Sequence, residues 1–110
     1  MPFWHHHDDE KAYHEVLATE PEHKAKISHE LIAGAAAFEA AKKYEEHCKA
    51  NGKPESHAMA KELIAGFTGA FIDRMVETKG LDELDTQKAK HEAAKRAHER
   101  SEVVLVEQFN

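Results

Sequence analysis

Apolar residues recur at helical spacing along two long segments of the chain. Residues three and four positions apart share one face of an α-helix, so such a stripe predicts a helix that buries one side. The first stripe comprises Ile27, Leu31, Gly34 or Ala35, Phe38 and Ala41, and the second comprises Leu63 or Ile64, Phe67, Phe71 and Met75. The one candidate for alternation is Val103–Val106, too short to distinguish a helix end from a strand. The pattern predicts an all-α fold.

Turn-forming residues set the expected boundaries of the second and third helices. Thr19-Glu20-Pro21-Glu22 has the form of a capping box with proline in the first turn, which predicts a helix start near Glu20. The segment Asn51–Pro54 offers a left-handed stop followed by a residue suited to starting the next helix. The second and third helices are therefore expected to form a hairpin around this turn.

A second stop lies at Gly80-Leu81, where Gly80 ends a helix and Leu81 folds back toward Val76. Asp82 and Asp85 then offer caps for a fourth helix. The expected helices cover roughly residues 8–18, 20–50, 55–79 and 83–102.

These elements predict one domain over residues 1–110, with a flexible, histidine-rich segment at 1–7 and a tail at 103–110. The expected architecture is a small helical bundle built on a long antiparallel hairpin, with a short N-terminal helix and a charged C-terminal helix. Both outer helices look too thin to cover the hairpin, so we expect self-association. The simplest form is a two-fold dimer pairing the Gly34/Gly66 region or the Phe67–Phe71 face. The expected buried residues are Leu31, Ile32, Phe38, Leu63, Ile64, Phe67, Phe71 and Met75.

The pentapeptide Glu-Leu-Ile-Ala-Gly occurs twice, at Glu30–Gly34 and Glu62–Gly66. A glycine in a helix interior costs about 1 kcal/mol relative to alanine, so Gly34, Gly66 and Gly69 need an explanation. Close approach of two backbones is one, and a ligand lying against bare backbone is the other.

Composition narrows the classes of partner. The chain has 21 acidic residues against 15 Lys and Arg, a formal charge of −6, which argues against nucleic acid and anionic membranes. The longest uncharged stretches, Leu31–Phe38 and Leu63–Ile72, are about half of the roughly 20 residues that span a bilayer. With no signal-peptide pattern either, we expect a cytoplasmic protein without a membrane span.

No catalytic motif is present. The sequence lacks the complete set of Glu-x-x-His pairs found in di-iron bundles and the His-Glu-x-x-His zinc motif. It also lacks a glycine-rich phosphate loop and Cys-x-x-Cys. We therefore expect a protein that is not an enzyme.

Histidine and cysteine carry the remaining candidate chemistry. The chain has ten histidines, and protonation of all of them would move the formal charge from −6 to +4. One candidate metal-ligand set is His5, His6 and His7 with His14, beside acidic residues, a density that binds Zn, Cu or Ni. The alternative is a solvated end that binds metal only weakly.

The second candidate set is His47, Cys48 and His57, which converge on the hairpin turn if the hairpin closes. With Glu55 or water as a fourth ligand, they suit Zn or Cu. The ordinary alternative is a histidine that complements a helix C-terminus and a small buried thiol. Two histidines from symmetric subunits would also ligate haem, with His29 or His47 as candidates.

Several segments resemble the fungal CipC-like proteins, named for induction by the antibiotic concanamycin. The segments that carry the resemblance are His29–His47, Asn51–Pro54, Phe71–Asp82, the aromatic pair Phe3-Trp4 and the region from Lys88 to Glu92. The resemblance implies a small, cytoplasmic fungal protein induced by stress or antibiotics, and it brings no catalytic residues. His5–His7 and the apolar tail Val103–Phe109 depart from the family pattern.

The expected function is that of a non-enzymatic stress-response protein acting by self-association or partner binding. The alternative is a histidine-based binding module for a metal, haem or a small apolar molecule. An enzyme whose site the sequence does not reveal is a third.

Overall fold

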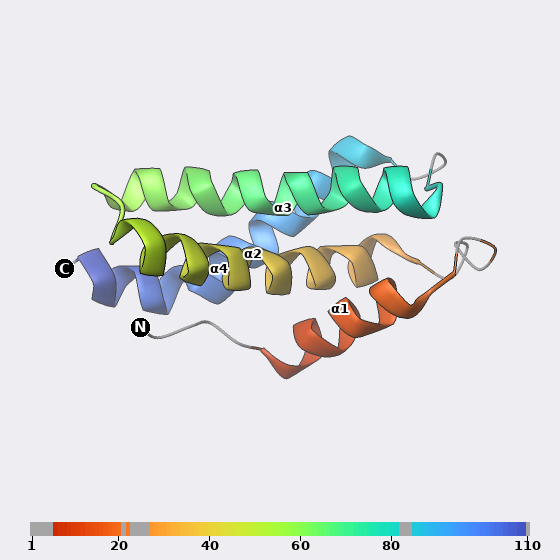
Figure 1. The fold of residues 1–110 in the computed structure, drawn as a ribbon, viewed down its shortest axis with the longest axis horizontal. Helices are drawn as coiled ribbons and strands as arrows, with labels where there is room; N and C mark the ends of the chain where they lie inside the picture. The colour runs from red at the N-terminus through yellow and green to blue at the C-terminus, as the bar shows by residue number, and fades with distance from the viewer. Residues whose placement is uncertain (1–5, 21, 23–26, 82–84, 110) are drawn as a thin grey trace.

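The computed structural model describes residues 6–20, 22, 27–81 and 85–109. Four helices account for the ordered elements in these ranges: α1 His7–Ala18, α2 His29–Asn51, α3 His57–Lys79 and α4 Thr86–Phe109. Figure 1 shows α2 between α3 and α1, with α4 passing behind them. No strand occurs among the described residues, and the all-α prediction is confirmed.

The start of α2 was predicted about nine residues too early. The helix begins at His29, where the Ser28 side chain accepts a hydrogen bond of 3.1 Å from the Leu31 backbone N–H. Thr19 ends α1 instead of starting α2, because its hydroxyl donates to the Glu15 carbonyl at 2.7 Å. The capping-box pattern was wrong here since a threonine satisfies carbonyls at a helix C-terminus as readily as it caps an N-terminus.

Both predicted stops are confirmed. Gly52 and Gly80 have the positive φ angles of 80° and 67° that suit glycine. After Gly80 the Leu81 backbone N–H donates to the Val76 carbonyl at 3.1 Å, and Leu81 is buried against the core. This is the fold-back expected of a leucine that follows a C-terminal glycine.

Helix α4 is longer than predicted. Its first turn is capped by Asp85, whose carboxylate accepts from the Lys88 backbone N–H at 3.1 Å; the other predicted cap, Asp82, lies outside the described residues. Val103–Val106 is helical, and the helix continues to Phe109. The predicted tail is thus the last turns of α4, because Leu105 packs fully buried against the hairpin.

Helix α2 forms the centre of the bundle. Every residue from Ile32 to Ala41 is buried, which places packing on all sides of the helix. Six of these ten residues are the alanines Ala33, Ala35, Ala36, Ala37, Ala40 and Ala41, and their small side chains let three neighbours approach. The exception to the apolar stretch is Glu39, which accepts a hydrogen bond of 2.9 Å from Arg74 of α3.

The outer helices cover the hairpin more closely than predicted. On α4 the buried residues are Ala89, Ala93, Ala97, Ser101 and Leu105. A buried carboxylate links helix α1 to α4. Asp9 of α1 is 2% exposed, and its Oδ2 lies 3.0 Å from Nε of Arg100. The cover is therefore closer than expected along α2, because alanine-lined helices can pack closely, but it leaves Leu63 and Phe67 of α3 only half-buried.

Gly34 lies beneath this contact between α1 and α4. A Cβ at Gly34 would lie 2.8 Å from a guanidinium nitrogen of Arg96, 3.2 Å from Cβ of Ala12 and 3.3 Å from Asp9. Close packing explains this copy of the pentapeptide, but the atoms nearest to Gly34 are side-chain atoms of α1 and α4 and not a second backbone. It also means that Gly34 is buried and does not offer the predicted dimer surface.

The predicted core is confirmed for five of its eight residues. Ile32, Phe38, Ile64, Phe71 and Met75 are buried. The other three, Leu31, Leu63 and Phe67, are half-buried. Leu63 and Phe67 lie on the face of α3 near the hairpin turn, where a groove remains open. None of the described helices is long and apolar enough to cross a membrane.

Candidate functional site

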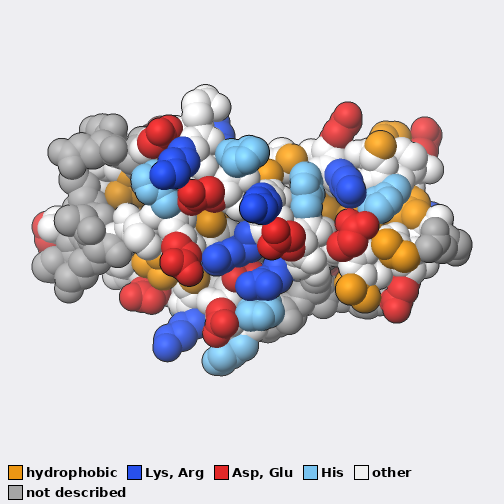
Figure 2. Space-filling model, turned by 180° about the vertical axis from the view of Figure 1, so that it is seen from behind, with side chains coloured by type: hydrophobic (Ala, Val, Ile, Leu, Met, Phe, Trp, Pro, Cys, Tyr) orange, Lys and Arg blue, Asp and Glu red, His pale blue; other side chains and the backbone are white. Residues whose placement is uncertain are grey.

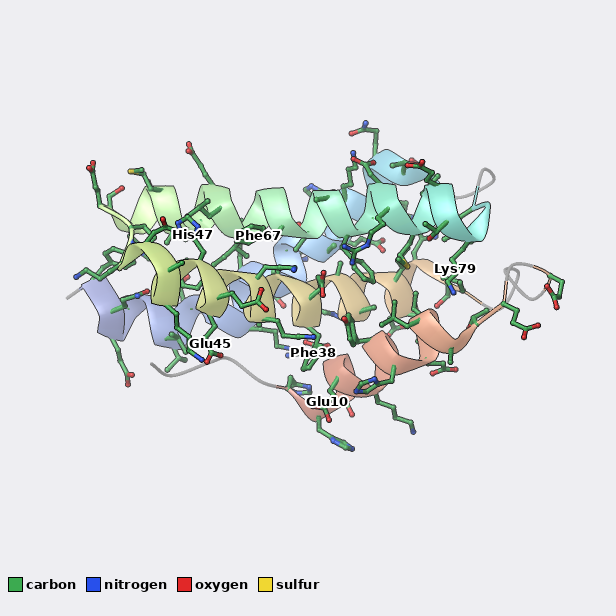
Figure 3. All side chains as sticks on the ribbon, viewed as in Figure 1. Glu10, Phe38, Glu45, His47, Phe67 and Lys79 are labelled. Atoms are coloured by element: carbon green, nitrogen blue, oxygen red, sulfur yellow. The ribbon has the colours of Figure 1, made fainter. Side chains whose placement is uncertain are left out.

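An open groove of about 660 Å³ lies at the turn between α2 and α3. It begins at the end of α2 with His47, passes the turn at Gly52–Pro54, and continues along α3 as far as Phe67. Figure 3 shows His47 on α2 and Phe67 on α3 on the same side of the hairpin. This size falls within the range of about 300–1,000 Å³ that is typical of small-molecule sites.

The lining of the groove on α3 is mostly apolar. Leu63 and Phe67 are half-buried, and Met59 is 44% exposed. Gly66 adds bare backbone, because an added Cβ there would have no neighbour within 4 Å. Gly66, in the second copy of the pentapeptide, thus lies at an open surface, whereas Gly34, in the first copy, lies inside a contact between helices.

His47 forms the wall of the groove on α2. Its ring centroid lies 6.4 Å from that of Phe67, and its Nδ1 lies 3.4 Å from the side-chain nitrogen of Asn51. Asn51 also donates to the His47 carbonyl at 3.2 Å. The amide therefore holds the imidazole against the last turn of α2, where it borders the apolar floor.

Two carboxylates and one ammonium group complete the lining. Among the described residues, the side chains of Glu55 and Glu62 have no hydrogen-bond or ion-pair partner. Lys53 is engaged, because its Nζ donates to the Gln108 carbonyl at 3.0 Å and lies 5.0 Å from the ring centroid of Phe109. The ammonium group thus binds residues at the C-terminal end of α4.

Behind the groove the end of α4 closes over Tyr44 of α2. The Tyr44 hydroxyl donates to Oε1 of Gln108 at 2.8 Å. Burial, followed by the influence of the neighbouring Cys48, raises the pKa of Tyr44 well above the ordinary phenol value. Cys48 lies in the same core cluster as Tyr44, Ile64 and Leu105. The phenol and the thiol therefore belong to the core.

The structure does not bring His47, Cys48 and His57 together. His47 borders the groove, Cys48 is buried in the core, and the His57 ring stacks on Phe109 with centroids 5.8 Å apart. Within the described ranges no three His, Cys, Asp or Glu side chains are grouped closely enough to hold a metal ion. Convergence failed because consecutive residues on a helix, such as His47 and Cys48, point about 100° apart.

The N-terminal candidates are only partly described. His5 lies outside the described residues. His6 lies 4.0 Å from the Asp8 carboxylate, His7 begins α1, and His14 packs at 5.5 Å against the ring of Tyr13. The haem candidate His29 is the first residue of α2, and His47, the other one, borders the groove.

The groove itself was missed from the sequence. Leu63 and Phe67 continue the apolar stripe of α3, so their spacing predicted core positions. The available signal was Gly66 between them, for which a ligand against bare backbone was the second explanation. The spacing of a stripe does not show which part of it other helices cover.

The fold and the groove define a small all-α protein with a central, alanine-rich helix and an apolar surface left open at the hairpin turn. A family model described as "Virulence factor CipC-like" matches residues 12–103. Since this match covers most of the chain, the protein belongs to the virulence factor CipC-like family. No curated protein sequence and no solved structure matches the chain. The family match assigns no reaction, ligand or partner, so the function must be argued from the site.

Proposed function

We propose that this protein is a non-enzymatic binding protein that holds a small, mostly apolar molecule in the groove between α2 and α3. The observation that carries the proposal is the groove itself, about 660 Å³ in volume and floored by Leu63, Phe67 and Met59. A methionine exposed to 44% gains from being covered, since each Å² of apolar surface removed from water contributes about 25 cal/mol. His47 and Asn51 supply polar groups at one edge to orient the ligand.

The cellular setting is proposed from the family. We propose a cytoplasmic protein that is induced under stress or antibiotic exposure, as the family resemblance implies. A binding protein fits this setting because it lowers the free concentration of an apolar compound in proportion to its own amount.

The test uses the neutral fluorescent probe N-phenyl-1-naphthylamine, whose emission rises in apolar surroundings. We expect saturable binding of one probe per chain. Gly66→Leu would fill the groove and weaken binding at least about fivefold, since it removes most of the apolar contact. Gly69→Leu is the matched control, because Gly69 lies on the same helix, an added Cβ there also meets nothing within 4 Å, and it does not line the groove. Equal affinity of the two variants would overturn the proposal.

Self-association is the second candidate function, favoured by a different surface from the one predicted. Gly34 and Phe71 are buried, whereas Val103 and Val106 on α4 are 71% and 40% exposed. Figure 2 shows apolar side chains gathered at the end of the molecule where α4 ends. Sedimentation velocity of the protein and of a V103S/V106S variant tests this candidate. A monomer at all concentrations would refute it.

Metal binding is a separate proposal for the segment His5–His7 with His14. Native mass spectrometry before and after EDTA tests it, using protein without an added tag. Zn, Cu or Ni retained at a fixed ratio to the chain, and lost on replacing His5–His7, is the expected result. A haem retained in the same experiment would instead direct attention to His29 and His47.

A further inference from the structure

The groove combines an apolar floor with a net negative charge. Its floor requires a ligand with an apolar body, because Leu63, Phe67 and Met59 offer no hydrogen-bonding groups beyond the backbone. Gly66 widens the floor and lets a flat body lie against the helix. The charge of that ligand is decided by the groups at the rim.

The two carboxylates at the rim are available to a ligand. Glu55 precedes α3 and Glu62 lies in its second turn, so they flank the floor from two points of the chain. Both are exposed, and neither has a side-chain partner within the part of the chain that the structure describes. Each carboxylate would gain a partner from a cationic ligand, and each would repel an anionic one.

The basic groups of the lining are already engaged. The Lys53 ammonium group donates to the Gln108 carbonyl and lies over the Phe109 ring, so its charge faces α4. His47 is held by Asn51. The ends of α2 and α3 at the turn carry partial charges of opposite sign, which offset each other. Glu55 and Glu62 outnumber Lys53, so the lining keeps a net formal charge of −1 with histidine neutral.

We infer that the ligand of this groove is an amphiphilic amine, a small molecule with an apolar, preferably aromatic, body and one positively charged nitrogen. The inference rests on the function proposed above and adds the charge of the ligand. Leu63, Phe67 and Met59 bind the body, and Glu55 and Glu62 bind the nitrogen. The aromatic preference follows from Phe67, an aromatic ring that lines the groove and is half-buried.

The test compares three naphthalenes of the same shape and different charge at pH 8 and low salt. They are 1-naphthylmethylamine as the cation, 1-naphthalenemethanol as the neutral compound and 1-naphthoate as the anion, each titrated by isothermal calorimetry or by displacement of N-phenyl-1-naphthylamine. We expect the cation to bind about tenfold more tightly than the anion, with the neutral compound between them. Raising the salt concentration to 0.5 M should remove most of this preference, because the carboxylates are exposed.

Charge-neutral variants identify the groups responsible. The double variant E55Q/E62Q should weaken binding of the cation about three- to tenfold and leave binding of the neutral compound unchanged. Glu77→Gln is the matched control, because Glu77 is an exposed glutamate of α3 that does not line the groove. This control should leave the binding of all three compounds unchanged.

The outcomes separate the inference from the proposed function. Equal binding of the three naphthalenes, with loss in Gly66→Leu, would leave the groove as a binding site and overturn the inference about charge. Tighter binding of the anion would also overturn the inference, since it would show that Lys53 or His47 governs the site. Failure of all the naphthalenes and of N-phenyl-1-naphthylamine to bind would overturn the proposed function itself.

Discussion

The repeated pentapeptide allows one substitution to be tested twice in different surroundings. Gly34 and Gly66 each end a Glu-Leu-Ile-Ala-Gly sequence inside a 23-residue helix. Replacing either glycine by alanine makes the same local change in helix propensity, which favours the variant by about 1 kcal/mol. Any difference between the two results therefore comes from packing.

The structure predicts opposite signs for the two variants. At Gly66 a new methyl group meets nothing within 4 Å, so the gain of about 1 kcal/mol is kept. At Gly34 the methyl group would force Arg96 to move and would crowd Cβ of Ala12 at 3.2 Å and Asp9 at 3.3 Å. Overpacking of this kind costs about 1–3 kcal/mol, which leaves Gly34→Ala destabilised by about 1 kcal/mol in net terms.

Thermal and urea unfolding followed by circular dichroism measure the difference. For a domain of this size 1 kcal/mol corresponds to about 4 °C, so Tm should rise by about 4 °C in Gly66→Ala and fall by about as much in Gly34→Ala. Gly69→Ala is a control that should behave as Gly66→Ala, because its surroundings are also open. Equal increases at Gly34 and Gly66 would refute the packing of α1 and α4 described here.

Three further predictions concern charge and protonation. Because burial raises the pKa of Tyr44, the folded state keeps the phenol proton while the unfolded state loses it, so stability should fall as pH rises through about 10. Tyr44→Phe should abolish this fall and cost about 1 kcal/mol at pH 7 through the lost bond to Gln108; parallel urea curves for both proteins at pH 7 and 10.5 would contradict it. Asp9→Asn should lower stability by about 2 kcal/mol, because two arginines of α4 lose their buried partner, whereas the exposed Asp8→Asn should change it by less than about 0.5 kcal/mol. Lowering the pH from 7.5 to 5.5 should change self-association or solubility, since up to ten histidine charges are added to a formal −6, and an unchanged sedimentation profile would refute a histidine-driven effect.

Local signals in the sequence were sufficient for the fold class and for the helix ends at glycine. The stops at Gly52 and Gly80 depend on backbone conformation within one turn, and they appear where predicted. The predicted start of α2 was wrong because the side chains of both Thr19 and Ser28 can cap a helix. Tertiary contacts decide which of the two begins α2. One such contact is the Lys79 ammonium group of α3, which binds the Leu17 and Thr19 carbonyls at the end of α1.

The site depended on information that periodicity does not contain. Whether Phe67 lies in the core or in the groove is decided by which neighbouring helices cover it, and such contacts cross from one helix to another. That Glu62 has no partner among the described residues, and that Lys53 contacts α4, can likewise be known only from the packed helices. Proximity along the chain led to the prediction that His47, Cys48 and His57 converge. The prediction was wrong because neighbouring residues of one helix face different surroundings.

The attachment of α1 has a consequence for motion. The backbone of α1 lies close to that of α2 only, and its further links are the Asp9 ion pairs to α4, the contact of the Tyr13 ring with Phe71 of α3 and the Lys79 hydrogen bonds from α3. Helices α2, α3 and α4 instead pack against one another in all three combinations. The molecule therefore has a cooperative three-helix unit and one helix that can detach as a separate unit by local unfolding. Detachment would uncover the small side chains around Gly34 and leave the groove at the hairpin turn intact, so the two surfaces can open and close independently.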